Sequence, residues 1–116
     1  FSFTRAHQNT RITDRENNIF AEVDVFLENG DCVMIVEVKT TLAVKDVDEH
    51  IERMEKLRRH ADLHDDHRKY LGALAGAVAG DSVKNYALKQ GFFVIVPSGD
   101  TFDIIRPEGG YHVREW

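Results

Sequence analysis

The sequence predicts an α/β domain with a mixed sheet: an antiparallel meander, a helical crossover and a strand parallel to the meander. Three observations predict this class. Before residue 42, short apolar segments rich in β-branched residues are typical of strands. From Val44 to Ala61, apolar residues recur at spacings of three and four, which is typical of one face of a helix. After residue 69, further short apolar runs are bounded by glycine and proline.

The first half of the chain predicts strands joined by turns. Thr10–Thr13 is expected to form a short strand, and the turn-rich residues 14–18 follow it. Ile19–Leu27 and Cys32–Thr40 then form a hairpin. Asn29-Gly30 predicts a two-residue type I′ turn between them, because both residues tolerate a positive φ.

The second half predicts alternating helices and strands. The stripe of the Val44–Ala61 helix is Val44, Val47, Ile51, Met54, Leu57 and Ala61. The small, apolar segment Tyr70–Gly80 is expected to be a buried strand, with a helix as the alternative. Asp81 or Ser82 would cap a helix ending at Gly91. The last two strands are Phe92–Val96 and Thr101–Ile105.

Composition limits the function classes. The 116 residues predict one domain, and 42% hydrophobic with 30% charged residues is ordinary for a globular protein. The formal net charge of -5 argues against a histone-like binder of nucleic acid. A single cysteine, Cys32, excludes an internal disulfide and fits a reducing compartment, so we expect a cytoplasmic protein without a membrane partner. Because the chain begins at Phe1, we expect a fragment of a longer protein.

The predicted hairpin brings charged residues together on one face. With a two-residue turn, Glu28 pairs with Asp31, Asp24 lies opposite Ile35, and Glu22 lies opposite Glu37. One face then carries Phe20, Glu22, Asp24, Phe26, Val33, Ile35, Glu37 and Lys39. The other face is wholly apolar and is expected to pack on the Val44–Ala61 helix, with Cys32 in the core. It carries Ala21, Val23, Val25, Leu27, Cys32, Met34, Val36 and Val38.

This face has the chemistry of a cation site. Asp24 and Glu37 are expected to be diagonal neighbours, so their side chains can close on one ion. Two close carboxylates in a half-buried site need a counterion or a raised pKa. Mg²⁺ suits two carboxylates plus waters, and Lys39 is placed to hold a metal-bound water or to stabilise a developing anion.

These residues resemble the PD-(D/E)xK nuclease superfamily, which includes type II restriction endonucleases and archaeal Holliday-junction resolvases. The resemblance rests on Asp24, a short hairpin and Glu37-Val38-Lys39 after an apolar run, and it covers about residues 10 to 96. The segment GALAGAVAGDSVKNYALKQGFFVIVPSGD also resembles an uncharacterised branch of that superfamily.

The resemblance implies a restriction-endonuclease-like fold over residues 1–116 and an Mg²⁺- or Mn²⁺-dependent nuclease. It implies Asp24, Glu37 and Lys39 as catalytic residues, with Asp24, Glu37 and the Val38 carbonyl as metal ligands. Glu22 is either a further ligand or a hydrogen-bonding neighbour of the ligands. Val23 stands where the family has proline, the family's first helix is not in this chain, and no Gln-x-x-x-Tyr motif follows.

Other readings stay open at this stage. His60, His64 and His67, with Asp65 and Asp66, could bind Zn²⁺, but a solvated loop is favoured. Thr41 could touch a phosphate, and the basic cluster of Lys56, Arg58 and Arg59 is expected to be a solvated helix end. The function is thus a nuclease acting on DNA or RNA, with DNA favoured as partner and a homodimer left open. The alternative is a catalytically inactive nuclease fold that binds nucleic acid or a protein.

Overall fold

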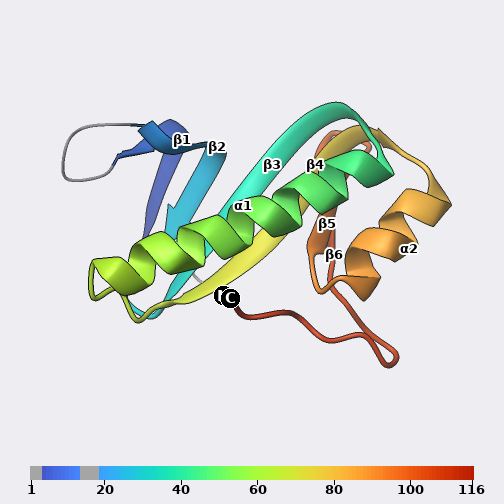
Figure 1. Cartoon of the computed structure of the whole chain (residues 1–116). Coiled ribbons are helices and arrows are strands. Elements are labelled where there is room, and N and C mark those ends of the chain that lie inside the picture. The colour runs from blue at the N-terminus through green and yellow to red at the C-terminus, as the bar shows by residue number, and fades with distance from the viewer. Residues whose placement is uncertain (1–3, 14–18) are drawn as a thin grey trace.

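The computed structural model is a mixed α/β fold with one six-stranded sheet and two helices (Figure 1). It describes residues 4–13 and 19–116, without the side chains of residues 13 and 19–22. The strands lie side by side in chain order: β1 (Arg5–Thr13), β2 (Ile19–Glu28), β3 (Cys32–Leu42), β4 (Lys69–Ala79), β5 (Phe93–Ser98) and β6 (Thr101–Ile105). The helices are α1 (Val44–Leu63) and α2 (Asp81–Lys89).

The predicted order of elements is confirmed. The strands β1, β2 and β3 form the antiparallel meander, and α1 leads from β3 to β4, which lies parallel to β3. The segment after Tyr70 is a strand rather than a helix. Gly91, with φ of 91°, follows the end of α2 as a helix terminator should. In the described part of the chain, no helix is both long and apolar enough to cross a membrane.

The predicted turn between β2 and β3 is wrong. Glu28 pairs with Val33 rather than Asp31, and neither Asn29 nor Gly30 has a positive φ. The side-chain oxygen of Asn29 accepts hydrogen bonds from the N–H groups of Asp31 (2.8 Å) and Cys32 (2.7 Å). An asparagine side chain that bonds the following backbone stabilises a longer loop without left-handed residues. The register is therefore shifted by two residues from the one predicted.

This shift changes which charged residues are neighbours. Val25 pairs with Val36, and the same register continued by one residue places Asp24 opposite Glu37. The expected pairs of Asp24 with Ile35 and of Glu22 with Glu37 are therefore wrong. Because the shift is an even number of residues, the side chains of Val25, Phe26 and Leu27 keep their predicted faces relative to β3. The predicted face of Val23 is wrong, because Val23 lies in the core cluster of Val33 and Ile35 instead of beside Val25.

The predicted packing face of α1 is also wrong. The helix covers the face of Val33 and Ile35, not the wholly apolar face of Met34 and Val36. The sequence misled because Glu37 and Lys39 lie on the Val33 face, yet α1 supplies charged partners for both of them. The buried core on this face consists of Val23, Val33, Ile35, Leu42, Val47, Met54, Leu57, Ala61, Tyr70, Leu74, Ala87, Phe92, Val94 and Trp116. It includes four members of the predicted helix stripe, whereas Val44 is exposed.

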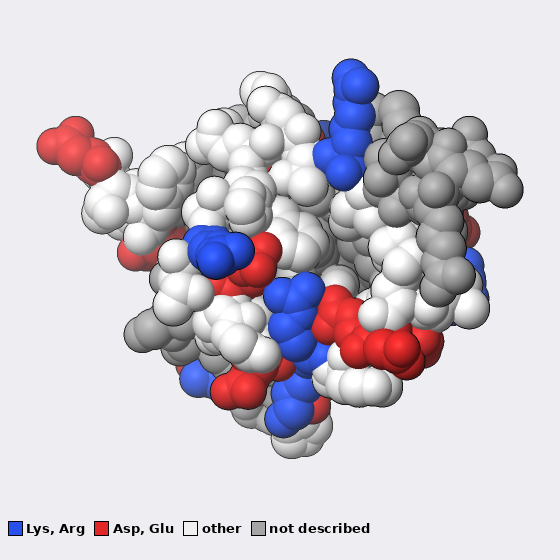
Figure 2. Space-filling view, turned by 90° about the vertical axis from the view of Figure 1, so that its left-hand side faces the viewer, with Lys and Arg blue, Asp and Glu red and all other residues white. Residues whose placement is uncertain are grey.

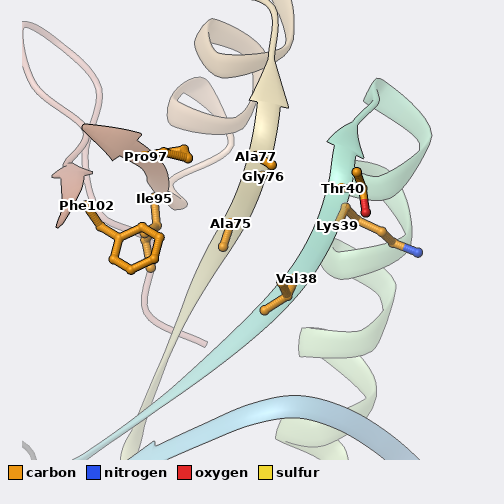
Figure 3. Close-up of a pocket in the computed structure, with 9 residues that line it drawn as sticks. All are labelled: Val38, Lys39, Thr40, Ala75, Gly76, Ala77, Ile95, Pro97 and Phe102. Atoms are coloured by element: carbon orange, nitrogen blue, oxygen red, sulfur yellow. The ribbon is translucent and has the colours of Figure 1, made fainter. Parts of the chain in front are cut away.

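The opposite face of the sheet carries a smaller apolar cluster, which contains no residue from either helix. It consists of Met34, Val36, Leu71, Ala73 and Phe93. Beyond it lies an apolar hollow of about 330 Å³, lined in part by Val38, Ala75, Ile95 and Phe102 (Figure 3). Lys39 projects from β3 away from Phe102, so the hollow and the Lys39 ammonium lie on different sides of the sheet.

Close packing of β4 against Phe92 gives a test of this core. A methyl group at Gly72 would lie 2.4 Å from the Phe92 ring, which is fully buried and stacks on Trp116. We therefore expect Gly72→Ala to lower the free energy of unfolding by about 1–3 kcal/mol through overpacking. Urea denaturation measures this, with Gly30→Ala as control because nothing lies near its Cβ. A loss at Gly72 no larger than at Gly30 would contradict the packing.

Candidate functional site

The candidate site lies where β2 parts from β3. The ladder between these strands includes Val25–Val36 but no pair between Asp24 and Glu37. Instead, the Asp24 side chain accepts a hydrogen bond from the backbone N–H of Val38 at 2.9 Å. The N–H and C=O groups of one strand residue point to the same edge, so the Val38 carbonyl faces the same gap.

A hollow marks this gap. On the other side of β2, the pairing with β1 skips Asn9, whose φ is 49°. The hollow has a volume of about 280 Å³ and is lined by Gln8, Asn9, Asp24, Val25 and Val38. Asp24 therefore has an accessible space beside it, even though one of its oxygens is bonded to β3.

Glu37 is a buried carboxylate held between two cations. Its side chain projects to the α1 side of the sheet and is 11% exposed. The Arg53 Nη1 atom lies 3.1 Å from Glu37 Oε2, and the Lys39 Nζ atom lies 3.6 Å from Oε1. Burial raises the pKa of Glu37 above its usual range; Arg53 opposes that rise, and the negative charge of Asp24 adds to it.

Lys39 bridges Glu37 to the start of α1. Its Nζ atom lies 3.8 Å from Asp46 Oδ1, and the other Asp46 oxygen accepts a hydrogen bond from the Ala43 N–H at 2.8 Å. Asp46 thereby satisfies a free N–H at the helix start. Gly76 lies beside Lys39 on β4, so no side chain from that position crowds the ammonium. Thr41 is exposed farther along β3, and its predicted phosphate contact stays a prediction.

Two residues of this cluster, His50 and Arg53, were not predicted. His50 is fully buried, and its Nε2 lies 3.1 Å from the Ile35 carbonyl oxygen, to which it must donate. The Nδ1 atom is then the acceptor for Arg53 Nη1 at 2.8 Å. Burial, followed by the nearby Arg53 charge, lowers the pKa of His50 to about 3, so the ring is neutral. Their signal in the sequence was a position at the edge of the apolar stripe, one turn apart.

The donor set fits a hard divalent cation. Asp24, Glu37 and the Val38 carbonyl offer oxygens from adjacent strands, which is the ligand chemistry of Mg²⁺ and Mn²⁺. The contribution of Asp24 to the raised pKa of Glu37 shows that the two carboxylates repel. Among the described residues, no group of three or more His, Cys, Asp or Glu side chains is arranged for a metal. The carbonyl and waters would therefore complete the shell, and the side chain of Glu22 lies outside the described residues.

The histidine-rich loop after α1 makes other contacts. The rings of His60 and His64 stack at 4.2 Å, and His64 Nδ1 lies 2.8 Å from the His60 carbonyl oxygen. Asp66 accepts hydrogen bonds from Arg68 Nη2 (2.8 Å) and from the Tyr70 hydroxyl (2.7 Å). Asp66 thus links the loop to the first residues of β4, which is a structural task.

Arg58 is not part of a solvated helix end, as the sequence had suggested. Its guanidinium donates to the backbone carbonyls of Asp66, Arg68 and Trp116, and it lies over the Tyr70 ring. The long cationic side chain thus ties the loop carbonyls of Asp66 and Arg68 to the Trp116 carbonyl, which also accepts a hydrogen bond from the Tyr70 N–H of β4. Lys56 and Arg59 are exposed.

Charge on the surface is mixed. Figure 2 views the molecule from the side that lies at the left of Figure 1, and there Lys and Arg side chains are interspersed with Asp and Glu side chains. This face shows no single broad basic surface.

Comparisons with protein-family models, with curated proteins and with solved structures gave no significant match to this chain. We therefore argue its function from the side chains themselves.

The hydrogen bonds of Asp66 in the loop after α1 are expected to make the free energy of unfolding depend on pH. Hydrogen bonds from Arg68 hold the pKa of Asp66 well below the usual range of an aspartate. A carboxyl group whose pKa is lower in the folded state than in the unfolded state stabilises the protein at pH values above the unfolded-state pKa. This stabilisation is lost as the pH falls toward and through the folded-state pKa. At pH 7 we expect Asp66→Asn to lower the free energy of unfolding by about 2 kcal/mol. The difference from wild type should shrink as the pH falls below about 4.

Urea denaturation at pH 7 and pH 3 measures both effects. Asp65→Asn is the matched control, because Asp65 is exposed and its φ of 56° suits asparagine. A pH-independent difference for Asp66→Asn would contradict the ionic role of Asp66.

Proposed function

We propose that this chain is a metal-dependent nuclease that hydrolyses phosphodiester bonds of DNA, or of RNA, within one restriction-endonuclease-like domain over residues 1–116. The observation that carries the proposal is the gathering of Asp24, Glu37 and Lys39 where β2 and β3 part. The Val38 carbonyl faces the same gap, so two carboxylates, a carbonyl and an ammonium come from adjacent strands.

In this proposal, Asp24, Glu37 and the Val38 carbonyl hold Mg²⁺ or Mn²⁺. When bound, such an ion supplies Lewis-acid stabilisation of phosphate charge and lowers the pKa of water. The hydrogen bond from Val38 fixes the Asp24 carboxylate against β3. Burial of Glu37 under α1 keeps competing water away from one side of the site.

Lys39 supplies the positive charge that faces the reacting phosphate. Its ammonium lies between Glu37 and Asp46, and its side chain is 40% exposed, so a ligand can reach it. Two carboxylate neighbours fix the ammonium before substrate arrives, which lowers the cost of reorganisation. In hydrolysis, a water oxygen forms a bond to phosphorus, the ester P–O bond breaks, and the leaving oxygen takes up a proton. Lys39 stabilises the charge that grows on the phosphoryl oxygens during that exchange.

A second function is favoured by one specific contact. Arg53 lies 3.1 Å from Glu37, so a cation of the protein itself already neutralises a carboxylate that a metal would need. If that pair persists in the presence of divalent ions, the chain is a catalytically inactive nuclease fold that binds nucleic acid or a protein partner. Cytoplasmic location and homodimer formation remain expectations from the sequence.

Three variants test the proposed roles. Asp24→Ala and Glu37→Ala remove ligands, so each should weaken Mn²⁺ binding at least about tenfold and abolish cleavage. Lys39→Ala removes only the facing charge, so it should keep metal affinity, or increase it, while cleavage falls by about 10²-fold or more. Calorimetric titration with Mn²⁺ and cleavage of labelled DNA and RNA in Mg²⁺ give the measurements.

The controls are Glu108→Ala and Lys89→Ala, which change the same charges at exposed positions beyond β6 and on α2. Metal binding without cleavage by the wild-type chain would favour the inactive alternative. If wild type binds no divalent ion and cleaves neither DNA nor RNA, the nuclease proposal is wrong. Wild-type cleavage by Lys39→Ala would show that the lysine is structural.

A further inference from the structure

A buried chain of hydrogen bonds fixes Arg53 beside Glu37. It runs from the Ile35 carbonyl through the His50 ring to Arg53 Nη1, with distances of 3.1 Å and 2.8 Å. His50 is fully buried and packs on the Phe92 ring at 5.0 Å, so its orientation is set by the core. The ion pair with Arg53 would be enough to compensate the buried charge of Glu37. The hydrogen bond from Arg53 to His50 additionally fixes the orientation of the Arg53 guanidinium.

Arg53 has donors to spare. Its Nη1 group contacts both His50 and Glu37, and within the described part of the chain its Nε and Nη2 groups form no hydrogen bond or ion pair. The side chain is 23% exposed, so these groups are reached from solvent at the edge of the site. A guanidinium held by one nitrogen, with other N–H groups open, matches the planar donor geometry that binds phosphate oxygens.

The net formal charge of the site also favours a phosphate-binding role for Arg53. The described groups are three carboxylates, Asp24, Glu37 and Asp46, and two cations, Lys39 and Arg53, so one negative charge is left. A bound divalent ion would leave one positive charge, which a single phosphodiester group neutralises. Without Arg53, the site and its ion would be neutral before substrate arrived, and the phosphate would bring an unbalanced charge.

We propose that Arg53 is a second phosphate-binding residue of this site, positioned by His50 and paired with Glu37 until a divalent ion takes over that carboxylate. This inference rests on the proposed function and names the group that holds the substrate phosphate beside Lys39. Arg53 changes partner from Glu37 to a phosphodiester oxygen, while its bond to His50 keeps the guanidinium in place.

DNA binding measured against salt concentration tests this role. The probe is a short fluorescent DNA duplex in Ca²⁺, titrated with wild type, Arg53→Gln and the control Arg106→Gln at several NaCl concentrations. Arg106 is exposed just beyond β6, far along the chain from the site residues. Loss of one phosphate contact should weaken binding about tenfold and reduce the slope of log K against log[salt] by about 0.9. Arg106→Gln should leave both unchanged.

A Mn²⁺ titration separates this role from a structural one. With a competing cation removed from Glu37, Arg53→Gln should bind Mn²⁺ as tightly as wild type or more tightly. If Arg53→Gln keeps the wild-type affinity for DNA, within about twofold, and the wild-type salt slope, the inference is wrong although the nuclease proposal stands. If wild type binds neither Mn²⁺ nor DNA, the nuclease proposal and the proposed role of Arg53 are both wrong.

A second pair of variants covers the case in which Arg53→Gln unfolds because Glu37 is left without its partner. Glu37→Gln and the double variant Glu37→Gln/Arg53→Gln both lack the buried negative charge. Compared in EDTA at low salt, the double variant should again show a salt slope smaller by about 0.9. Equal slopes for the two would overturn the inference.

Discussion

The ion pair between Glu37 and Arg53 is the interaction on which the site depends. Glu37 lies on β3, a strand paired on both sides, and is nearly covered by α1. A carboxylate in such a place costs several kcal/mol unless it is paired and hydrogen-bonded. The Arg53 guanidinium from α1 and the Lys39 ammonium from β3 itself pair with this carboxylate. Burial still raises the pKa of Glu37, so the pairing only partly offsets the desolvation.

That requirement explains why α1 packs where it does. A purely apolar count of the two faces favours the Met34–Val36 face, because it carries no charge near the hairpin. The helix instead lies over Val33 and Ile35, where Val47, Met54 and Leu57 fill the core and the polar edge of the helix reaches Glu37. Apolar burial and charge pairing are therefore satisfied by the same surface of α1.

The sequence predicted the element order because each segment has its own period and its own terminators. It also predicted that Asp24 lies near Glu37 and Lys39, because the shift of register is small and leaves Asp24 beside the Glu37-Val38 segment of β3. It did not predict the shift itself, because Asn29 shapes the loop through its side chain rather than through a positive φ. His50 and Arg53 were missed for another reason: their partners, Ile35 and Glu37, are 15 and 16 residues away, and only packing brings them together.

If the proposed function is right, the same contacts would give the site two states, one without and one with a bound ion. With Arg53 on Glu37, a cation of the protein itself offsets the charge of the buried carboxylate. With an ion on Glu37 and Asp24, Arg53 would be free to turn its donors toward an oxyanion while His50 kept it in place. Such a site would couple ion binding to phosphate binding, because each would favour the same position of Arg53. Had Glu37 been unpaired, the free protein would have carried the full cost of its buried charge.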